Sequence, residues 1–363
     1  MSQAKQIMIS GYYGFDNYGD ELILARICEH LCKWGYQPVV LTQNAERTGQ
    51  TLSGLNTSEI QTVPRMNIVA VWQAMQKISA FISGGGGLFQ DKSSWKSPLY
   101  YSALISMAHH LAKPIAFFAQ GVGPLNTSIG KSCASNALQK SKLIVVRDEK
   151  SVSLVNALQA LWLKQKATPV FKMADTVWTT PLEFIYPDSD RRGISISIRP
   201  CELINNTSGW DNLLKVLLPL LQELPPDEPI YLIAAQPSED VPVLNQLKQK
   251  LSESLAGRCQ IITGLEAINN SIATSRHVIA MRYHVVLMSL LMQTPVYALA
   301  YDPKVQSLTE QAKIKGWNLM TNALQPPAVS QDDFLTIDPY CLKTNQDEAE
   351  AGFKHLENWL AHI

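Results

Sequence analysis

Short runs of apolar residues alternate along this chain with longer stretches in which apolar positions recur every three or four residues. The first pattern predicts buried strands, and the second predicts helices packed on one side. In the first half we expect strands at residues 6–10, 38–42, 80–83, 114–118 and 143–146, and helices at 21–33 and 101–111. This alternation is typical of βα units around a parallel sheet.

The alternation restarts after a polar, proline-containing stretch at residues 182–192. We expect further strands at 193–198, 229–235, 260–262, 277–280 and 295–300, and helices at 210–221, 241–254, 285–292 and 347–361. The pattern predicts an α/β protein with an N-terminal Rossmann-like domain over residues 1–184 and a second one over 185–346. Residues 347–363 would form a helix that packs back toward the first domain.

The composition fits an ordinary two-domain globular protein, with 363 residues of which 46% are hydrophobic and 17% charged. Lys and Arg balance Asp and Glu at 31 each, so nothing indicates a nucleic acid partner. No apolar stretch reaches the length of about 18 residues that a membrane span needs, and no signal peptide is recognisable. The six cysteines lack zinc-site spacing, and we expect free thiols in a reducing cytoplasm.

Basic residues follow several predicted strands directly. Arg282 and His284 come after 277–280, Lys304 follows 295–300, and Arg147 and Arg199 also end strands. Ligands of open α/β sheets bind at the carboxyl ends of the strands. Fixed cations beside a group that titrates near neutral pH suit an anionic substrate that undergoes proton transfer. The alternative, a helix cap and arginines paired with carboxylates, stays open here.

Two unusual loops follow strands in the first half. The first, GYYGFDNYGDE at residues 11–21, departs from the dinucleotide pattern and sets Asp20 and Glu21 at a helix start, where they would repel a pyrophosphate. Its aromatic residues and Asn17 suit a sugar, although Asn17 or Asp20 could simply cap the helix. The second, SGGGGLFQDK at 83–92, allows close backbone approach to an anion or a sugar, but it lacks a Walker lysine.

The ordered set of motifs resembles the polysaccharide pyruvyl transferase family, most closely its CsaB type. The matching segments are GYYGFDNYGDE, SGGGGLFQD, QGVGP, VRDEKS, SIRP and MRYH…AYDPK, which together span most of the chain. The resemblance implies a GT-B-like architecture of two Rossmann-like domains facing a cleft. It also implies transfer of a pyruvyl group from phosphoenolpyruvate to two hydroxyls of a sugar, giving a ketal and phosphate. In the CsaB type the sugar belongs to a lipid-linked cell-wall precursor.

The resemblance also gives the candidate residues their expected roles. The catalytic residues would be His284 as general acid and base, with Arg147 and Lys304 at the phosphate. The donor would be bound by Arg282, Tyr283, Arg199, Lys92, Gly85 and Gly86. The acceptor would be bound on the N-terminal domain by Tyr13, Asn17, Gly19, Asp20 and Glu21.

The expected partners are phosphoenolpyruvate and a sugar or lipid-linked saccharide, without nucleic acid, metal or other cofactor. We expect a cytoplasmic protein, with peripheral contact at the inner face of the membrane if the acceptor is lipid-linked. Two other functions stay open. A GT-B glycosyltransferase using a nucleotide sugar would also need cations in the second domain, but no obvious base-reading acidic motif is present there. A non-catalytic relative that binds sugars or anions would keep the same fold.

Overall fold

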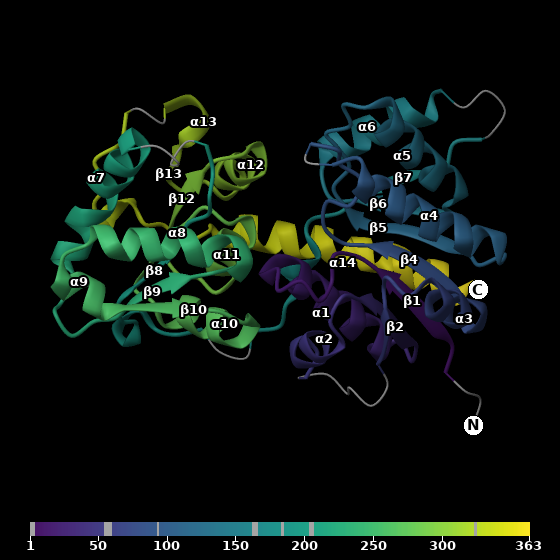
Figure 1. Ribbon diagram of the computed structural model, residues 1–363, viewed down its shortest axis with the longest axis horizontal. Coiled ribbons are helices and arrows are strands. Elements are labelled where there is room, and N and C mark those ends of the chain that lie inside the picture. Colours follow the sequence, from purple (N-terminus) through teal and green to yellow (C-terminus); the bar gives the residue numbers. More distant parts are fainter. Residues whose placement is uncertain are drawn as a thin grey trace. The chain divides into compact units, whose positions relative to one another are not determined.

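The computed structural model describes residues 4–53, 60–92, 94–161, 166–182, 185–202, 207–322 and 325–363. The chain forms two compact units (Figure 1). Unit 1 comprises Met1–Thr180 and Asn345–Ile363, and unit 2 comprises Pro181–Thr344. These divisions lie within a few residues of the domain boundaries drawn from the sequence.

Unit 1 is built on a seven-stranded parallel sheet with the order β3-β2-β1-β4-β5-β6-β7. Its strands are β1 (Gln6–Ser10), β2 (Gln37–Thr42), β3 (Gln61–Pro64), β4 (Ala80–Gly84), β5 (Ile115–Gln120), β6 (Leu143–Val146) and β7 (Val170–Lys172). Its helices are α1 (Tyr18–Lys33), α2 (Ala45–Thr51), α3 (Ile68–Lys77), α4 (Lys96–His110), α5 (Ser128–Lys140), α6 (Glu149–Gln159) and the C-terminal part of α14 (Pro339–Ala361).

Unit 2 contains a six-stranded parallel sheet with the order β10-β9-β8-β11-β12-β13. Its strands are β8 (Ile194–Ser197), β9 (Ile230–Ile233), β10 (Cys259–Ile262), β11 (His277–Ala280), β12 (Val296–Ala300) and β13 (Gly316–Asn318). Its main helices are α7 (Thr207–Glu223), α8 (Pro237–Lys250), α9 (Glu253–Arg258), α10 (Leu265–Thr274), α11 (Tyr283–Leu291) and α12 (Pro303–Ala312), followed by the short α13 (Leu319–Asn322).

One predicted helix, residues 241–254, is wrong in its extent. The structure has two helices there, because Leu251 and Ser252 both have an extended backbone. The side chain of Ser252 caps α9 by accepting from the backbone N–H of Leu255 at 3.4 Å. None of the helices in the described ranges combines the length and the apolar character needed to cross a bilayer.

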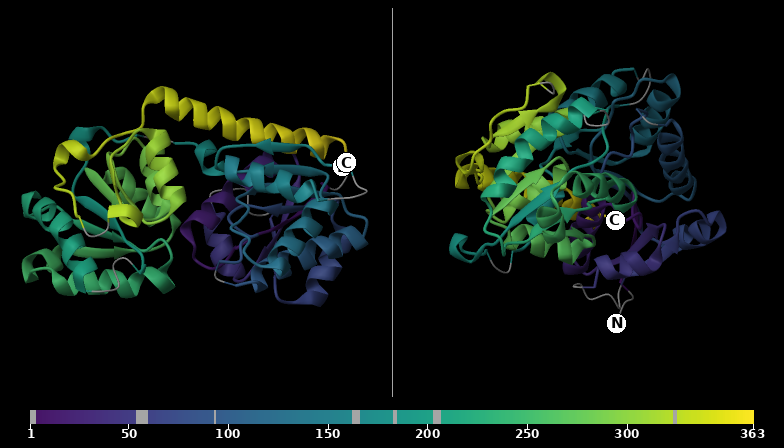
Figure 2. Two further views of the ribbon diagram at one scale, coloured as in Figure 1. Left: turned by 90° about the horizontal axis from the view of Figure 1, so that it is seen from above. Right: turned by 60° about the vertical axis from the view of Figure 1, so that its left-hand side comes forward.

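Helices cover both faces of the unit 1 sheet (Figures 1 and 2). Buried side chains of α3, α4, α5 and α6 share one apolar cluster with the strands. The opposite face carries α1 and the C-terminal part of α14, whose Phe353 stacks on His30 at 3.6 Å and lies 5.4 Å from the ring of Phe118. Residues 345–363 therefore form part of the core of unit 1.

Each sheet reverses its strand order once, between β1 and β4 in unit 1 and between β8 and β11 in unit 2. At such a switch point the helices that follow the two central strands pack on opposite faces of the sheet. The loops after these two strands are therefore separated, and ligands of open α/β sheets bind in the crevice between them. In unit 1 the described residues of these loops are 11–17, 85–92 and 94–95. In unit 2 they carry Arg199 and Arg282. The structure thus places most of the predicted site residues at or near the two switch points.

Candidate functional site

Arg282 is held rigidly at the carboxyl edge of the unit 2 sheet. It is the N-cap residue of α11, directly after β11. Its guanidinium donates through Nη2 to Asp240 Oδ1 at 2.5 Å and to Glu239 Oε2 at 3.0 Å, and through Nε to Asp240 Oδ2 at 3.1 Å. Asp240 is fully buried in the first turn of α8. This two-point pair with Asp240 fixes the plane of the guanidinium.

Arg199 shares one of these carboxylates. Its Nη2 lies 3.2 Å from Glu239 Oε2, the same oxygen that Arg282 contacts. Its Nη1 donates to the hydroxyl of Tyr301 at 3.0 Å, and the guanidinium lies 5.0 Å from the centroid of that ring. Glu239 therefore bridges two arginines that follow adjacent strands. A carboxylate already occupies the place where two guanidinium groups converge.

His284 and Lys304 follow neighbouring strands of the same sheet edge. His284 is the second residue of α11, half-buried, with its ring edge-on to Tyr283 at a centroid distance of 5.0 Å. Lys304 is exposed in the first turn of α12, where Asp302 caps the helix by accepting from the backbone N–H of Lys304 at 2.9 Å. The structure confirms the predicted positions of both side chains just beyond β11 and β12.

The electrostatics of this cluster favour a permanently charged arginine. Burial lowers the pKa of Arg282, but the hydrogen bonds and charges of Asp240 and Glu239 outweigh this effect and raise the pKa above its ordinary value. Burial raises the pKa of the Asp240 carboxyl, and the bonds from Arg282 oppose that rise. The sequence-based alternative, an arginine paired with carboxylates, is thus correct for Arg282, although one of its partners is buried.

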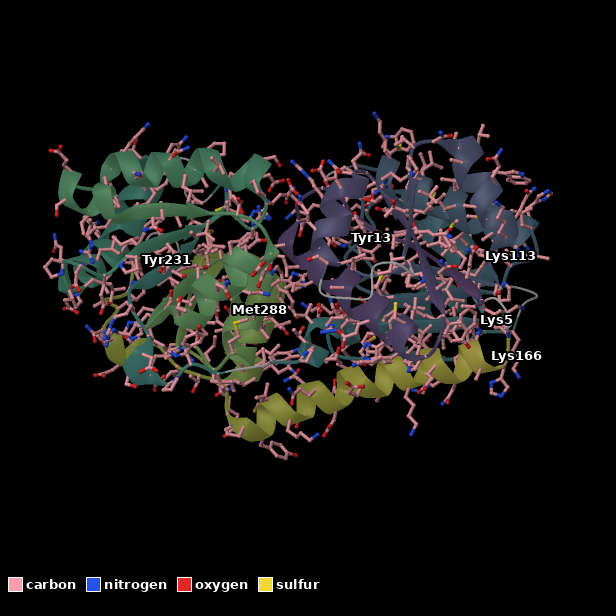
Figure 3. All side chains as sticks on the ribbon, turned by 90° about the horizontal axis from the view of Figure 1, so that it is seen from below. Lys5, Tyr13, Lys113, Lys166, Tyr231 and Met288 are labelled. Atoms are coloured by element: carbon pink, nitrogen blue, oxygen red, sulfur yellow. The ribbon has the colours of Figure 1, made fainter. Side chains whose placement is uncertain are left out.

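At the switch point of unit 1, the two unusual loops pack on each other. The hydroxyl of Tyr13 donates to the carbonyl oxygen of Gly84 at 2.6 Å, and the side chain is fully buried. Figure 3 labels Tyr13 near this edge of the sheet and Lys5 and Lys113 near the other. The sequence predicted that Tyr13 contacts the acceptor. Because Tyr13 has no exposed surface, its ring cannot make that contact. It joins the two loops instead.

Three other predicted acceptor residues shape the start of α1. Asn17 caps the helix by accepting from the backbone N–H of Asp20 at 3.3 Å, so the capping alternative holds for Asn17. Gly19 is buried in the first turn. Asp20 is half-buried beside the loop at residues 83–92, the glycine loop, where a Cβ added to Gly86 would lie 2.4 Å from Asp20 Oδ1. Gly86 has a φ of 72°, so a side chain there would be strained as well as crowded.

Glu21 is the buried acid of this region, with 5% of its surface exposed. Its carboxylate accepts from the backbone N–H of Gly14 at 2.7 Å and from the hydroxyl of Thr51 at 3.3 Å. Burial raises the pKa of Glu21 to about 7, against the lowering effect of these bonds. Glu21 thus fixes the loop from inside and exposes too little surface for the predicted contact with an acceptor.

The remaining predicted residues of unit 1 lie after β4 and β6. Arg147 pairs with the buried Asp175 at 3.0 Å, and Asp148 caps α6 by accepting from the backbone N–H of Ser151 at 2.8 Å. The alternative that Asp148 caps a helix is correct, but Arg147 pairs with a carboxylate 28 positions along the chain rather than with a local one. Lys92 is exposed, and Gly85, with a φ of 76°, packs so that an added Cβ would lie 2.4 Å from the side chain of Ile23.

Sequence reasoning missed Arg65, which ties the loop at residues 11–17 to α4. Its Nη1 donates to the carbonyl oxygen of Gly11 at 3.0 Å, and its guanidinium lies 4.5 Å from the ring centroid of Tyr100 and 5.1 Å from that of Phe15. Phe15 in turn stacks on Tyr12 at 4.0 Å. The aromatic residues of the loop are thus partly accounted for by this internal cation–π cluster.

Glu239 and Asp240 were missed as well. A usable signal was present, because two adjacent acids lie between the predicted strand at 229–235 and the predicted helix at 241–254. In the part of the chain that the structure describes, no three His, Cys, Asp or Glu side chains gather in a way that could hold a metal ion.

A family model for polysaccharide pyruvyl transferases matches residues 17–303 of this sequence. The chain belongs to the polysaccharide pyruvyl transferase family. It is therefore a transferase of polysaccharide biosynthesis. No curated protein matches the sequence. The matched region of this pyruvyl transferase family member contains Arg147, Arg199, Arg282 and His284.

Solved structures similar to this family member are GT-B glycosyltransferases and epimerases. HepE from Anabaena, solved with UDP and glucose, has a TM-score of 0.60 at 13% identity, covering 99% of this chain and 100% of its own. The UDP-GlcNAc 2-epimerase of Methanocaldococcus jannaschii, solved with UDP-GlcNAc and UDP, has a TM-score of 0.59 at 11% identity, covering 99% and 100%. MnaA from S. aureus, solved with UDP, has a TM-score of 0.59 at 14% identity, and the match covers 99% of this chain and 98% of MnaA. At these identities the likeness establishes the shared fold of two Rossmann-like domains.

Proposed function

We propose that this protein transfers a pyruvyl group from phosphoenolpyruvate to two hydroxyls of a sugar, forming a cyclic ketal and releasing phosphate. The observation that carries the proposal is the Glu239 carboxylate between Arg199 and Arg282, at the sheet edge where His284 lies in the first turn of α11. Two arginines that already hold a carboxylate are suited to the carboxylate of the donor. Family membership supplies the transferase class.

The donor carries two anionic groups and needs one proton. Arg282 and Arg199 would hold the carboxylate, with Glu239 displaced toward solvent, since 39% of the Glu239 side chain is exposed. Lys304 would neutralise the phosphate as charge develops on it, and Tyr283 would line the donor site. Arg147, for which the resemblance implied a contact with the phosphate, lies in unit 1 and is paired with Asp175 there.

His284 would act as the general acid that protonates the methylene carbon of phosphoenolpyruvate. Protonation creates an oxocarbenium-like centre at the neighbouring carbon. One sugar hydroxyl adds there, the bond to phosphate breaks, and the second hydroxyl closes the ketal. The two sugar hydroxyls lose one proton each. One of these protons replaces the proton that was delivered to the new methyl group, and the other is carried away on the phosphate.

On the acceptor side, Asp20 is the predicted residue best suited to contact a sugar, because it is a partly exposed carboxylate beside the glycine loop. We propose an amino sugar of a lipid-linked cell-wall precursor as the acceptor, as in the CsaB type. The support for this finer assignment is the ordered set of motifs from GYYGFDNYGDE to AYDPK.

Phosphate release tests the donor. The protein is mixed with phosphoenolpyruvate and a short amino-sugar saccharide, and a parallel mixture contains UDP-sugars in place of phosphoenolpyruvate. We expect acceptor-dependent phosphate release in the first mixture and no UDP release in the second. Consumption of a UDP-sugar without consumption of phosphoenolpyruvate would instead identify a nucleotide-sugar glycosyltransferase.

Substitution of His284 tests the proton transfer. His284→Ala and His284→Gln should lower kcat by roughly 10²-fold or more, the usual contribution of a general acid, and should leave the KM for phosphoenolpyruvate nearly unchanged. The steady-state rate of phosphate release gives both constants. Undiminished turnover in the two variants would remove His284 from the mechanism.

A further inference from the structure

Large apolar side chains are exposed at the N-terminal ends of three neighbouring helices of unit 1. Ile68 and Val69 at the start of α3 are 71% and 67% exposed, and Met66 just before them is 69% exposed. Trp95 and Leu99 at the start of α4 are also exposed, and so is Ile129 at the start of α5. These six make up most of the large hydrophobic side chains that the described residues expose. We call them the apolar rim.

Specific contacts hold these helices side by side. The hydroxyl of Tyr100 in α4 donates to the carbonyl oxygen of Arg65, directly before Met66, at 2.9 Å. The ring of Trp72 in α3 lies 6.1 Å from that of His110 in α4. Further along, Asn136 of α5 donates to Ser102 and Ser106 of α4 at 2.9 and 3.1 Å. The apolar rim thus spans adjacent segments of one face of unit 1.

The loop between β4 and α4 is anchored to α5 in the same way. The Asp91 carboxylate accepts from the backbone N–H groups of Asn126 and Thr127, each at 2.7 Å. These bonds bring the loop that leads to Trp95 beside the start of α5, where Ile129 lies. Because helices that follow parallel strands start at the carboxyl edge, the whole apolar rim lies at the edge that also carries residues 11–17 and the glycine loop.

The chain segment that carries the apolar rim is basic. Residues 60–147 contain nine Lys and Arg but a single acid, Asp91, although the whole chain has 31 of each sign. Asp91 is buried, with 8% of its surface exposed. Lys92, Lys96 and Lys131, by contrast, are exposed next to the apolar side chains. No acid on α3, α4 or α5 compensates them.

We propose that the apolar rim and its lysines dock this protein on an anionic lipid surface. Apolar side chains that alternate with lysines suit the boundary between lipid headgroups and acyl chains, where Trp and Leu insert and Lys reaches phosphate. A second protein copy suits this face less well, because the cores of protein interfaces are depleted of Lys. The docking proposal rests on these observations and does not depend on the proposed function.

Its purpose rests on the proposed function. A saccharide on a lipid carrier would meet the protein at the membrane surface, and the apolar rim shares a sheet edge with Asp20. Docking would therefore bring the acceptor loops to the headgroup region without any membrane-spanning segment.

Vesicle sedimentation tests the docking without any substrate. The full-length protein is mixed with vesicles rich in phosphatidylglycerol or made of phosphatidylcholine alone. We expect binding to the anionic vesicles that weakens with salt, and at least tenfold weaker binding to the neutral ones. The double substitution Ile68→Glu and Val69→Glu, and separately Lys96→Glu, should each weaken anionic binding roughly tenfold or more.

Leu161→Glu is the matched control. Leu161 is 74% exposed after the C-terminal end of α6, and so at the opposite edge of the same sheet, and its substitution should leave vesicle binding unchanged. Circular dichroism of each variant checks folding, and phosphate release with a water-soluble acceptor should be unaffected. If the protein turns over phosphoenolpyruvate but does not bind vesicles, the docking proposal fails and the proposed function stands. If the protein binds vesicles but does not turn over phosphoenolpyruvate, the proposed function fails and the docking proposal stands.

Two results would overturn the docking proposal. One is equal binding of the wild-type protein to both vesicle types, or to neither. The other is a wild-type dimer, found by light scattering, that the Ile68→Glu and Val69→Glu substitutions dissociate, since a second copy would then cover the apolar rim.

Discussion

At the scale of single residues, Glu239 would compete with the donor for Arg199 and Arg282 in the proposed donor site. Its Oε2 lies 3.2 and 3.0 Å from the two guanidinium groups. Glu239→Gln removes the competing charge and should lower the KM for phosphoenolpyruvate severalfold with little change in kcat, because a half-exposed ion pair contributes only about 1 kcal/mol or less. Steady-state kinetics measures both constants. A higher KM would mean that Glu239 positions the arginines rather than competing for them.

The substitution Asp240→Asn should affect stability far more than Glu239→Gln does. Asp240 is fully buried and pairs with Arg282 at 2.5 Å, so loss of its charge leaves a guanidinium whose side chain is only 12% exposed without its main partner. We expect the free energy of unfolding to fall by about 3 kcal/mol, whereas Glu239→Gln should cost less than about 1 kcal/mol. Urea denaturation compares the two variants.

The raised pKa of Glu21 should make the stability of the protein depend on pH. Its pKa is about 7 in the folded chain against 4.5 as its ordinary value. Between these values the folded state binds a proton that the unfolded state has lost, so the free energy of unfolding falls as pH rises from about 4.5 to about 7. The full effect is on the order of 3 kcal/mol. Glu21→Gln, which mimics the protonated acid, should come closest to the wild type in stability at about pH 4.5 and be more stable than it at pH 8.

Urea denaturation at several pH values measures this difference. Glu46→Gln changes an exposed acid on the neighbouring α2 and serves as the control, with no pH-dependent difference expected. A constant gap between Glu21→Gln and wild type across this range would show that Glu21 is already ionised in the folded chain at pH 5.

The sequence was informative about residues whose role is local. Helix caps at Asn17 and Asp148 were recognisable because a cap depends on the residues immediately around it. The partners of Arg282 were not, since Asp240 lies 42 positions away and meets Arg282 only after β8, β9 and β11 have paired. The burial of Tyr13 and Glu21 was missed for the same reason, because it depends on the packing of the glycine loop and of α2.

At the scale of elements, strand prediction succeeded where strands are buried on both faces. All residues of β4 and β12 are buried, and such strands give continuous apolar runs. The edge strands β3 and β7 were missed because they are short and mostly exposed or half-buried, and their sequences QTVP and VFK carry little pattern. Burial, rather than intrinsic strand preference, made the difference.

The C-terminal part of α14 gives a prediction at this scale. Phe353 is 1% exposed and contacts His30 and Phe118. Phe353→Ala should destabilise unit 1 by about 3–5 kcal/mol, as large-to-small changes of buried aromatics do. Hydrogen exchange should show faster exchange of amides in β1 and β5 and no change in β8 and β11.

Lys354→Ala, an exposed neighbour on the same helix, is the control and should change stability by less than about 0.5 kcal/mol. Equal loss of protection in both sheets would contradict the assignment of residues 345–363 to unit 1.

At the scale of the whole molecule, the restart of the strand and helix alternation near residue 185 anticipated two sheets with helices on both faces. The order of strands was beyond the sequence pattern, because pairing in a parallel sheet is decided by packing over long separations. The order of the motifs identified the family, which the match over residues 17–303 confirms. The CsaB subtype and the acceptor stay proposals, because the similar structures share 11–14% identity and establish the fold.

The central claim is that a pyruvyl group reaches the sugar through protonation of the donor methylene. The most direct measurement is mass spectrometry and NMR of the product formed from phosphoenolpyruvate and an amino-sugar acceptor in heavy water. We predict a ketal whose methyl group carries non-exchangeable deuterium, formed far more slowly by His284→Gln. An unlabelled product, or phosphoenolpyruvate recovered intact while a sugar nucleotide is consumed, would contradict the account.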